Sequence, residues 1–373
     1  MAEPSDILDT LLKQVSFDIQ KMRVEDSTIA AKIESVCRNP HNQAGIRLLL
    51  SCTLAKVHNP SLDIRKPYTK IGGEDSYSGR TYDEAHIGPF ITRHQLPCNP
   101  TTAFLTPALR NRNIVLTPDV DLVGRPPELY RTVLGLLDDI HHGQVSAKEV
   151  LTEAIRWLLV IKEERRDRIE GLIRELELPG STPLSSESIV SLIAQHLKCR
   201  GASRLPVLVV AAAYRSAVEY LRERALPLRP HNAADERTGA LGDIEITLVN
   251  DDKVVTSYEM KMKRVTQGDI DRALQKIVDA GKRVDNYIFI TTEVVDPRVA
   301  EYAASVYEKT GGIEVAILDC IGSLRHFLHL FHRLRTRYLS AYQELVLAEP
   351  ESAVGHPLKE AFLALRRVAE SGE

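Results

Sequence analysis

GALGDIEITLVNDDKVVTSYEMKMKRV, residues 239–265, is the stretch that decides the fold of the C-terminal half of the chain. Its pattern predicts two strands, 242–250 and 254–263, around a turn rich in Asn and Asp. Because side chains alternate between the two faces of a strand, Glu259 and Lys261 should project from the same face. A carboxylate and a lysine in an apolar strand cost desolvation free energy unless another group compensates. The segment therefore predicts a charged site on an otherwise apolar sheet.

Asp243 adds a second carboxylate to this site. It begins the first of the two strands, and pairing of the strands would bring it near Glu259 at one sheet edge. Two such carboxylates can hold one or two divalent cations, typically Mg²⁺. The metal would stabilise the attacking and leaving oxygens of a phosphodiester, while Lys261 would position the water or, if burial depresses its pKa, deprotonate it. The alternative is a solvated strand face with a cross-strand ion pair, because 27% of the residues are charged.

The order of the surrounding elements favours the metal site. The expected elements are a helix over 206–224, the two strands, a helix over 266–281 and a buried strand over 286–292. Residues 204–320 thereby resemble the PD-(D/E)XK nuclease superfamily, with Asp243, Glu259 and Lys261 matching its D…E-x-K motif. Two strands are apparent before the second helix, where that core has three.

The resemblance implies a fold of the α/β (α+β) class with a restriction-endonuclease-like αβββαβ core. It also implies a role for Glu219, which falls where many members carry an additional helical Glu near the metal. The alternative for Glu219 is a surface ion pair. Gly242 stands where the older written motif has Pro, which is a common variant.

The N-terminal part has a different character. Residues 1–58 are expected to be helical, whereas Pro and Gly punctuate 59–130 and indicate a long functional surface. Helical periodicity is strong again over 146–174, which opens with Ser146 and Glu149 at capping-box spacing.

A linker-like break at 178–183 (LPGSTP) suggests a domain boundary. We therefore predict three parts: a helical and loop-rich DNA-recognition and dimerisation region over 1–180, a catalytic core over 181–345, and a C-terminal helix or tail over 346–373. A single long helix is expected through SLRHFLHLFHRLRTRYLSAYQELV, which runs across the last of these boundaries.

Residues 76–111, SYSGRTYDEAHIGPFITRHQLPCNPTTAFLTPALRN, look like the N-terminal part of the SacI family of type II restriction endonucleases. This resemblance implies cleavage of double-stranded DNA at a short palindrome, dependence on Mg²⁺, and a homodimer whose two-fold axis matches that of the site. A cognate DNA methyltransferase is expected in the same system, but not as a stable subunit.

The turn-rich segment also carries side chains suited to DNA recognition. Arg and Lys position a duplex through its phosphates, while Arg reads guanine and Asn reads adenine. The alternative is that Tyr82 packs the domain and the arginines form ordinary surface pairs. Asp83 is expected at a capping or solvent-exposed position, and Arg65 and Lys66 belong to the same basic segment. The candidate DNA contacts are Arg80, Tyr82, Arg93, His94, Asn99, Thr101, Arg110 and Arg112.

Composition narrows the function classes. The chain has 48 Lys and Arg against 51 Asp and Glu, a net charge of −3, which argues against a wholly basic coat protein but not against a local basic cleft. No run approaches the roughly 20 apolar residues that span a bilayer, and the N-terminus has no signal-peptide pattern. Five scattered cysteines without a CxxC pair fit a cytoplasmic protein.

We therefore expect a Mg²⁺-dependent type II restriction endonuclease. Two alternatives stay open: a modification-dependent or repair nuclease of the same superfamily, and a non-catalytic, sequence-specific DNA-binding protein in which the D…E-x-K string is accidental. Three histidines near the C-terminus, at 326, 329 and 332, are interpreted as part of a basic amphipathic helix rather than as a metal site.

Overall fold

The computed structural model describes residues 3–39, 43–99, 101–124, 126–176, 183–228, 240–251 and 253–371. The chain divides into two compact units, Met1–Asp167 and Arg168–Glu373, and each has its own hydrophobic core. The expected linker lies outside the described residues over 178–182. None of the helices in the described ranges is long and apolar enough to cross a membrane.

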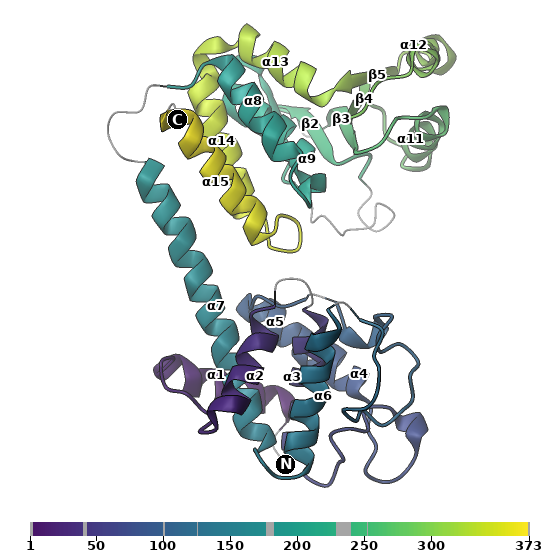
Figure 1. Ribbon diagram of the computed structural model, residues 1–373. Helices are drawn as coiled ribbons and strands as arrows, with labels where there is room; N and C mark the ends of the chain where they lie inside the picture. The colour runs from purple at the N-terminus through teal and green to yellow at the C-terminus, as the bar shows by residue number, and fades with distance from the viewer. Residues whose placement is uncertain are drawn as a thin grey trace. The chain divides into compact units, whose positions relative to one another are not determined.

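The first unit is helical (Figure 1), and the described residues within 1–58 form three helices, in agreement with the helical character expected of that range. Its principal helices are α1 (Pro4–Phe17), α2 (Ser27–Cys37), α3 (Ala44–His58), α6 (Pro127–His141) and the beginning of α7 (Ala147–Leu176). Helix α3 is the centre of this unit, since every residue from Ala44 to Ala55 is buried. A helix that is apolar on all sides has to be surrounded, and α1, α2, α6 and the turn-rich segment pack around α3.

Short helical turns order the segment between α3 and α6. These are η1 (Thr69–Ile71), α4 (Gly79–Tyr82), η2 (Asp83–Ile87), α5 (Gly88–His94) and η3 (Ala103–Leu105). Asp83 anchors the segment to α3: its carboxylate accepts hydrogen bonds from Arg47 Nε at 2.8 Å and from the Ala103 N–H at 3.1 Å. Asp83 is completely buried, so the expectation of a solvent position was wrong. The carboxylate tolerates burial because Arg47 neutralises its charge.

Ser146 and Glu149 form the expected capping box at the start of α7. The Ser146 hydroxyl accepts from the Glu149 N–H at 3.1 Å, and the Glu149 carboxylate accepts from the Ser146 N–H at 3.0 Å. Two backbone donors that the helix cannot satisfy are thereby paired, which explains why α7 begins at Ala147.

The second unit is built on a five-stranded mixed sheet with the order β1-β2-β3-β4-β5. The strands are β1 (Glu223–Ala225), β2 (Ile244–Leu248), β3 (Val254–Lys261), β4 (Asn286–Thr291) and β5 (Glu314–Asp319). The first three strands pair antiparallel and the last three pair parallel. The protein is therefore a mixed α/β protein, largely helical in content.

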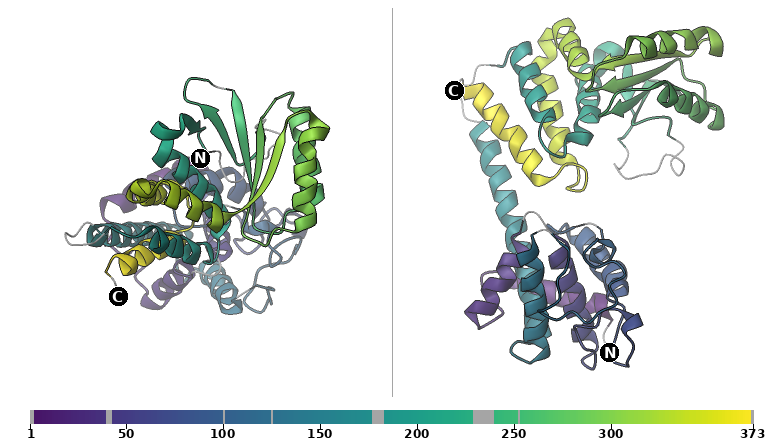
Figure 2. Two further views of the ribbon diagram at one scale, coloured as in Figure 1. Left: turned by 90° about the horizontal axis from the view of Figure 1, so that it is seen from above. Right: turned by 45° about the vertical axis from the view of Figure 1, so that its right-hand side comes forward.

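Helices cover both faces of the sheet (Figures 1 and 2). One face packs against α8 (Ser186–Leu197), α9 (Leu205–Leu221), α13 (Cys320–Leu330), α14 (Arg335–Ala348) and α15 (His356–Ser371), directly or through the shared core. The other face packs against α11 (Gln267–Asp279) and α12 (Pro297–Thr310). Tyr287 and Phe289 of β4 belong to this second core, and Glu259 and Lys261 share their face through the parallel register.

Two expectations about this unit were wrong at element ends. The helix expected over 206–224 ends at Leu221, because Arg222 adopts a left-handed conformation (φ 58°) and the chain turns into β1, the third strand before α11. The single long helix expected near the C-terminus is two helices, α13 and α14. Phe331 leaves helical geometry at φ −111° and ψ 47°, and the turn η5 (His332–Leu334) follows.

His196 in the core of the second unit predicts acid sensitivity. Its Nε2–H donates to the Leu358 carbonyl at 2.9 Å and its Nδ1 accepts from the Tyr342 hydroxyl at 3.0 Å, so the neutral ring is fully satisfied. Burial lowers the pKa of His196 to about 4. The unfolded chain therefore takes up a proton near pH 6.5 that the folded protein refuses until about pH 4.

The unfolding free energy should consequently fall by about 3 kcal/mol between pH 7 and pH 4 through His196 alone. Urea titrations at both pH values measure the loss, and the same titrations of His196→Gln, which has no titrating ring, isolate it from other groups. An equal loss in both proteins would contradict the assignment.

Candidate active site

Asp243 lies immediately before β2, where close backbone contact fixes its position. Its N–H donates to the Tyr258 carbonyl at 2.7 Å, and its Oδ2 accepts from the Met260 N–H at 2.7 Å. The antiparallel register pairs Ile244 with Tyr258, so Asp243 lies one step further along, beside Glu259. A Cβ at Gly242 would clash with the Tyr258 carbonyl oxygen, which explains why glycine precedes the Asp.

Glu259 and Lys261 project from the same face of β3, as the alternation predicted. The Lys261 Nζ lies 2.5 Å from Glu259 Oε1, and both side chains are largely buried, at 19% and 14% exposure. On the opposite face, the Tyr258 hydroxyl contacts the Tyr214 hydroxyl of α9 at 2.9 Å. The structure therefore brings Asp243, Glu259 and Lys261 together at the junction of β2 and β3.

Two further side chains hold Glu259 from the β4 and α11 side. The Tyr287 hydroxyl lies 2.5 Å from Glu259 Oε2 and 2.7 Å from the Leu241 carbonyl oxygen. Lys276 Nζ of α11 lies 3.7 Å from the same Oε2. Tyr287 thus connects the Glu259 carboxylate to the Leu241 backbone, two residues before Asp243. It therefore helps to set the distance between the Asp243 and Glu259 carboxylates.

Lys261 is cationic in this arrangement. Burial acts to lower its pKa, but the hydrogen bond and charge of Glu259, with the charge of Asp269, outweigh burial and raise the pKa. A lysine with a raised pKa is a poor proton acceptor. Orientation of a water or of a phosphate oxygen agrees with this charge, whereas proton transfer to Lys261 with its pKa depressed by burial near a bound metal stays a prediction.

The structure does not bring Glu219 to this cluster. Glu219 lies near the C-terminal end of α9, four residues before Glu223, which pairs with Leu248 at the far end of β2 from Asp243. Its exposed carboxylate contacts Arg337 of α14 at 3.2 Å. This contact is the surface ion pair that the sequence offered as the alternative.

Asp269 of α11 is the residue that sequence analysis missed. It is buried, and its Oδ1 lies 3.3 Å from Lys261 Nζ. Its spacing from Thr266, T-x-x-D before an apolar-periodic helix, is a readable capping signal. The proximity to Lys261 follows from tertiary packing, which the spacing does not contain.

Among the candidate DNA contacts of the first unit, Tyr82 and Arg80 have intramolecular partners. The Tyr82 hydroxyl lies 2.7 Å from His58 Nδ1, and the ring packs against the core. Arg80 is exposed and pairs with Glu84 one turn later at 2.8 Å. These are the contacts that the alternative to DNA binding predicts, in which Tyr82 packs the domain and Arg80 forms an ordinary surface pair.

Arg93 and His94 share one acidic partner. Asp9 of α1 lies 3.0 Å from Arg93 Nη1 and 3.4 Å from His94 Nε2. Arg93 remains more than half exposed, so this exposed pair adds little stability and leaves the guanidinium near solvent.

Asn99 and Thr101 form a local turn. The Asn99 side-chain oxygen accepts from the Thr101 N–H at 3.2 Å and from the Thr101 hydroxyl at 3.0 Å. Further along, Arg110 is exposed, and Arg112 donates from Nε to the Ala108 carbonyl at 3.1 Å. The eight candidates therefore lie along one segment, with Arg80, Arg93, Thr101 and Arg110 the most exposed.

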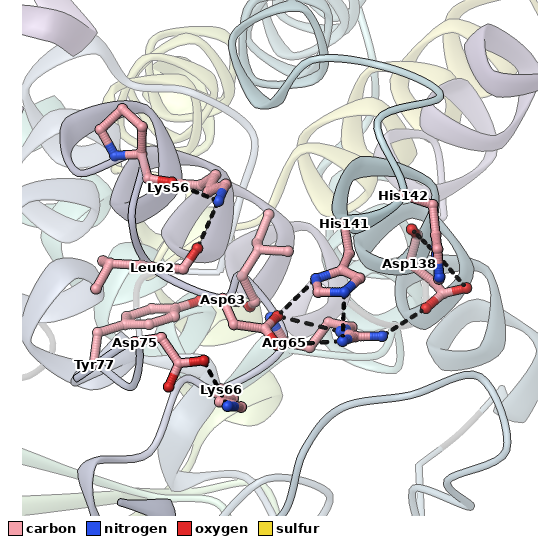
Figure 3. A network of polar contacts seen from close by, with 12 residues as sticks. Lys56, Leu62, Asp63, Arg65, Lys66, Asp75, Tyr77, Asp138, His141 and His142 are labelled. Carbon is pink, nitrogen blue, oxygen red and sulfur yellow. Dashed lines mark hydrogen bonds and ion pairs between the residues drawn. The ribbon is translucent and has the colours of Figure 1, made fainter. Parts of the chain in front are cut away.

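Arg65 and Lys66 belong to a network that neutralises them inside the first unit (Figure 3). Arg65 donates to Asp63 at 3.2 Å, to Asp138 at 3.1 Å and to His141 Nε2 at 2.7 Å. Burial acts to raise the pKa of Asp63, yet the hydrogen bonds from Arg65 leave that pKa lowered. Lys66 pairs with Asp75 at 2.6 Å. Arg65 and Lys66 thus form intramolecular ion pairs with carboxylates of the first unit.

The donor chemistry of the Asp243 and Glu259 pair fits a hard divalent cation. Mg²⁺ is typically held by one or two carboxylates, with waters and substrate phosphates completing its octahedron. In the described part of the chain, no group of three or more His, Cys, Asp or Glu side chains is placed to hold a metal, and this includes the histidines of α13 and η5. A site here would therefore depend on two carboxylates and on oxygens from water or substrate.

Residues 183–293 match the family model described as the SacI restriction endonuclease C-terminal domain. The match covers under a third of the chain, and it spans β1 to β4 with Asp243, Glu259, Lys261 and Asp269. No curated protein matches the chain. This segment is similar to a restriction endonuclease domain, and the similarity supports a restriction endonuclease that acts on DNA.

Proposed function

We propose that the chain is a Mg²⁺-dependent type II restriction endonuclease with a PD-(D/E)XK site formed by Asp243, Glu259 and Lys261. The observation that carries the proposal is the convergence of these three side chains where β2 meets β3, inside the segment similar to the SacI domain.

In the proposed reaction, Asp243 and Glu259 would hold the metal through carboxylate oxygens. Bound Mg²⁺ would supply charge stabilisation at the scissile phosphate and a more acidic water. Lys261, which has Asp269 as a second carboxylate neighbour, would orient the attacking water or a phosphate oxygen. Hydrolysis would leave a 5′-phosphate and a 3′-hydroxyl.

The remaining parts of the proposal concern recognition. We assign DNA contacts to the first unit, with the exposed Arg80, Arg93, Thr101 and Arg110 the first to examine. A short palindromic site would be read by a homodimer, because a two-fold symmetric sequence matches a two-fold symmetric protein. A cognate methyltransferase would be a separate enzyme of the same system.

Digestion of a defined, unmodified plasmid tests this function. In Mg²⁺ the protein should give discrete fragments whose sequenced ends fall at one short site, and chelation of the metal should stop the reaction. Cleavage confined to methylated DNA would indicate a modification-dependent nuclease instead. Sequence-specific binding without hydrolysis at any metal concentration would refute nuclease activity.

Tyr287→Phe should weaken metal binding without unfolding the protein. The change removes one hydroxyl from a buried ring and frees Glu259 Oε2 and the Leu241 carbonyl from their shared donor. Partners of metal ligands typically contribute roughly 10- to 100-fold in metal affinity. Calorimetric titration with Mn²⁺ measures the change.

Tyr258→Phe is the matched control, because it removes a hydroxyl from the neighbouring strand on the opposite sheet face. Its Mn²⁺ affinity should equal that of the wild type. Equal affinities in all three proteins would show that Tyr287 does not support the metal-binding carboxylate.

A further inference from the structure

Asp269 takes part in the capping of α11 and also contacts two cationic side chains. Its Oδ2 accepts from the Thr266 N–H at 2.9 Å and from the Thr266 hydroxyl at 2.6 Å, which completes a capping box at the start of α11. Its Oδ1 accepts from Arg272 at 2.6 Å and lies 3.3 Å from Lys261 Nζ. Both carboxylate oxygens therefore have fixed partners, and the side chain is buried.

Asp269 is ionised in this environment. Burial acts to raise its pKa, but the hydrogen bonds from Thr266 and Arg272 and the charge of Lys261 outweigh burial and lower the pKa strongly. Asp269 is thus a permanent anion beside Lys261.

Lys261 lies between two carboxylates that differ in the proposed reaction. Glu259, at 2.5 Å, is a proposed metal ligand, and a cation bound there would compete with the ammonium for the same oxygens. Asp269 is committed to the helix cap and to Arg272, so its contact with Lys261 does not depend on the metal. When Glu259 is occupied, Asp269 is the anion that remains beside the lysine.

We propose that Asp269 is a positioning residue that anchors the Lys261 ammonium at the active site once Glu259 binds the metal. The cap of α11 is thereby connected to the catalytic lysine, and helix packing sets where the ammonium lies. The expected effect on kcat rests on the proposed nuclease function, whereas the anchoring of Lys261 by Asp269 does not.

Kinetics of Asp269→Asn test the consequence. Asn keeps an oxygen for the Thr266 cap and removes the charge facing Lys261. We expect kcat to fall roughly 10- to 100-fold, as for other residues that orient active-site groups, while KM for DNA and Mn²⁺ affinity stay at wild-type values. Asp269→Glu keeps both the charge and a capping-box residue and should recover part of kcat.

Asp296→Asn is the matched control. Asp296 caps α12 on the same side of the sheet, accepts from the Arg298 N–H at 2.9 Å and has no contact with the active-site cluster. Its kcat should equal that of the wild type. A loss of kcat in Asp269→Asn no larger than in this control would overturn the proposal, and so would a loss of Mn²⁺ affinity, because Asp269 would then act as a ligand.

Nitrogen-15 NMR of lysine ammonium groups tests the anchoring without any cleavage. Glu259→Ala removes both carboxylate oxygens of residue 259 from Lys261, and the Lys261 signal, assigned with Lys261→Arg, should persist in this variant. It should vanish through rapid exchange in Glu259→Ala/Asp269→Asn. If the Lys261 signal persists in the double variant, Asp269 does not anchor the lysine, even if the protein is a nuclease. If the signal disappears in the double variant but the wild-type protein cleaves no DNA, the anchor is supported and only the proposed function is refuted.

Discussion

Asp243→Asn should reduce DNA cleavage in Mg²⁺ by about 10³-fold or more while DNA binding in Ca²⁺ is retained. The substitution keeps an oxygen that can accept from the Met260 N–H, so the junction of β2 and β3 should stay folded. It removes one of the two negative charges available to the metal. Metal-derived stabilisation of the transition state amounts to several kcal/mol, and each 1.4 kcal/mol corresponds to about a tenfold change in rate.

Glu219→Gln is the matched control for this experiment. Both variants remove one carboxylate from the second unit, but Glu219 contacts Arg337 on the surface and lies away from the cluster. Single-turnover cleavage and Ca²⁺-supported DNA binding should both be unchanged in Glu219→Gln. Full activity in Asp243→Asn would refute the site, and a loss in Glu219→Gln would restore the role that the family resemblance implies for that residue.

The strands that carry the site could be predicted because their signal is local. Alternation of side chains along 254–263 identifies which face holds Glu259 and Lys261, and the structure has that face toward α11. The short strand β1 could not be found in the same way. Its three residues, Glu223 to Ala225, continue a helical pattern, and they become a strand through pairing with β2 and the left-handed turn at Arg222.

The partners of the site depend on contacts between distant segments. Tyr287 reaches Glu259 because β4 pairs in parallel with β3, a register that no local pattern determines. The T-x-x-D cap of α11 is readable from spacing, yet its approach to Lys261 depends on how α11 packs on the sheet. Sequence thus predicts which charged groups share a sheet face better than it predicts the groups that hold them in place.

In the first unit, Arg47 likewise has a role that is apparent from local sequence and a partner that is not. A lone arginine in the apolar sequence GIRLLL indicates a buried partner, because an unpaired charge inside a helix core is costly. The partner, Asp83, lies 36 residues away in the turn-rich segment. Arg47 also donates to the Asn99 carbonyl at 2.7 Å, so one guanidinium joins α3 to two points, Asp83 and Asn99, of the segment that carries the candidate DNA contacts.

Arg47→Met should therefore destabilise the first unit by about 3 to 5 kcal/mol, because it leaves the Asp83 carboxylate buried without its cation. Trp157, the only tryptophan in the chain, packs beneath Arg38 and Arg156 in this unit, so its fluorescence in urea reports the loss.

Two further variants separate a buried charge from a lost contact. Arg80→Met breaks the exposed pair with Glu84 and should cost less than about 1 kcal/mol. Arg47→Met/Asp83→Asn removes both buried charges and keeps an oxygen that can accept from the Ala103 N–H, so it should be more stable than Arg47→Met alone. If the double variant is no more stable than Arg47→Met, the penalty does not come from an uncompensated Asp83. Such a result would indicate that the loss of stability comes from the missing contact between Arg47 and the Asn99 carbonyl. Arg47 would then stabilise the fold of the proposed DNA-binding segment.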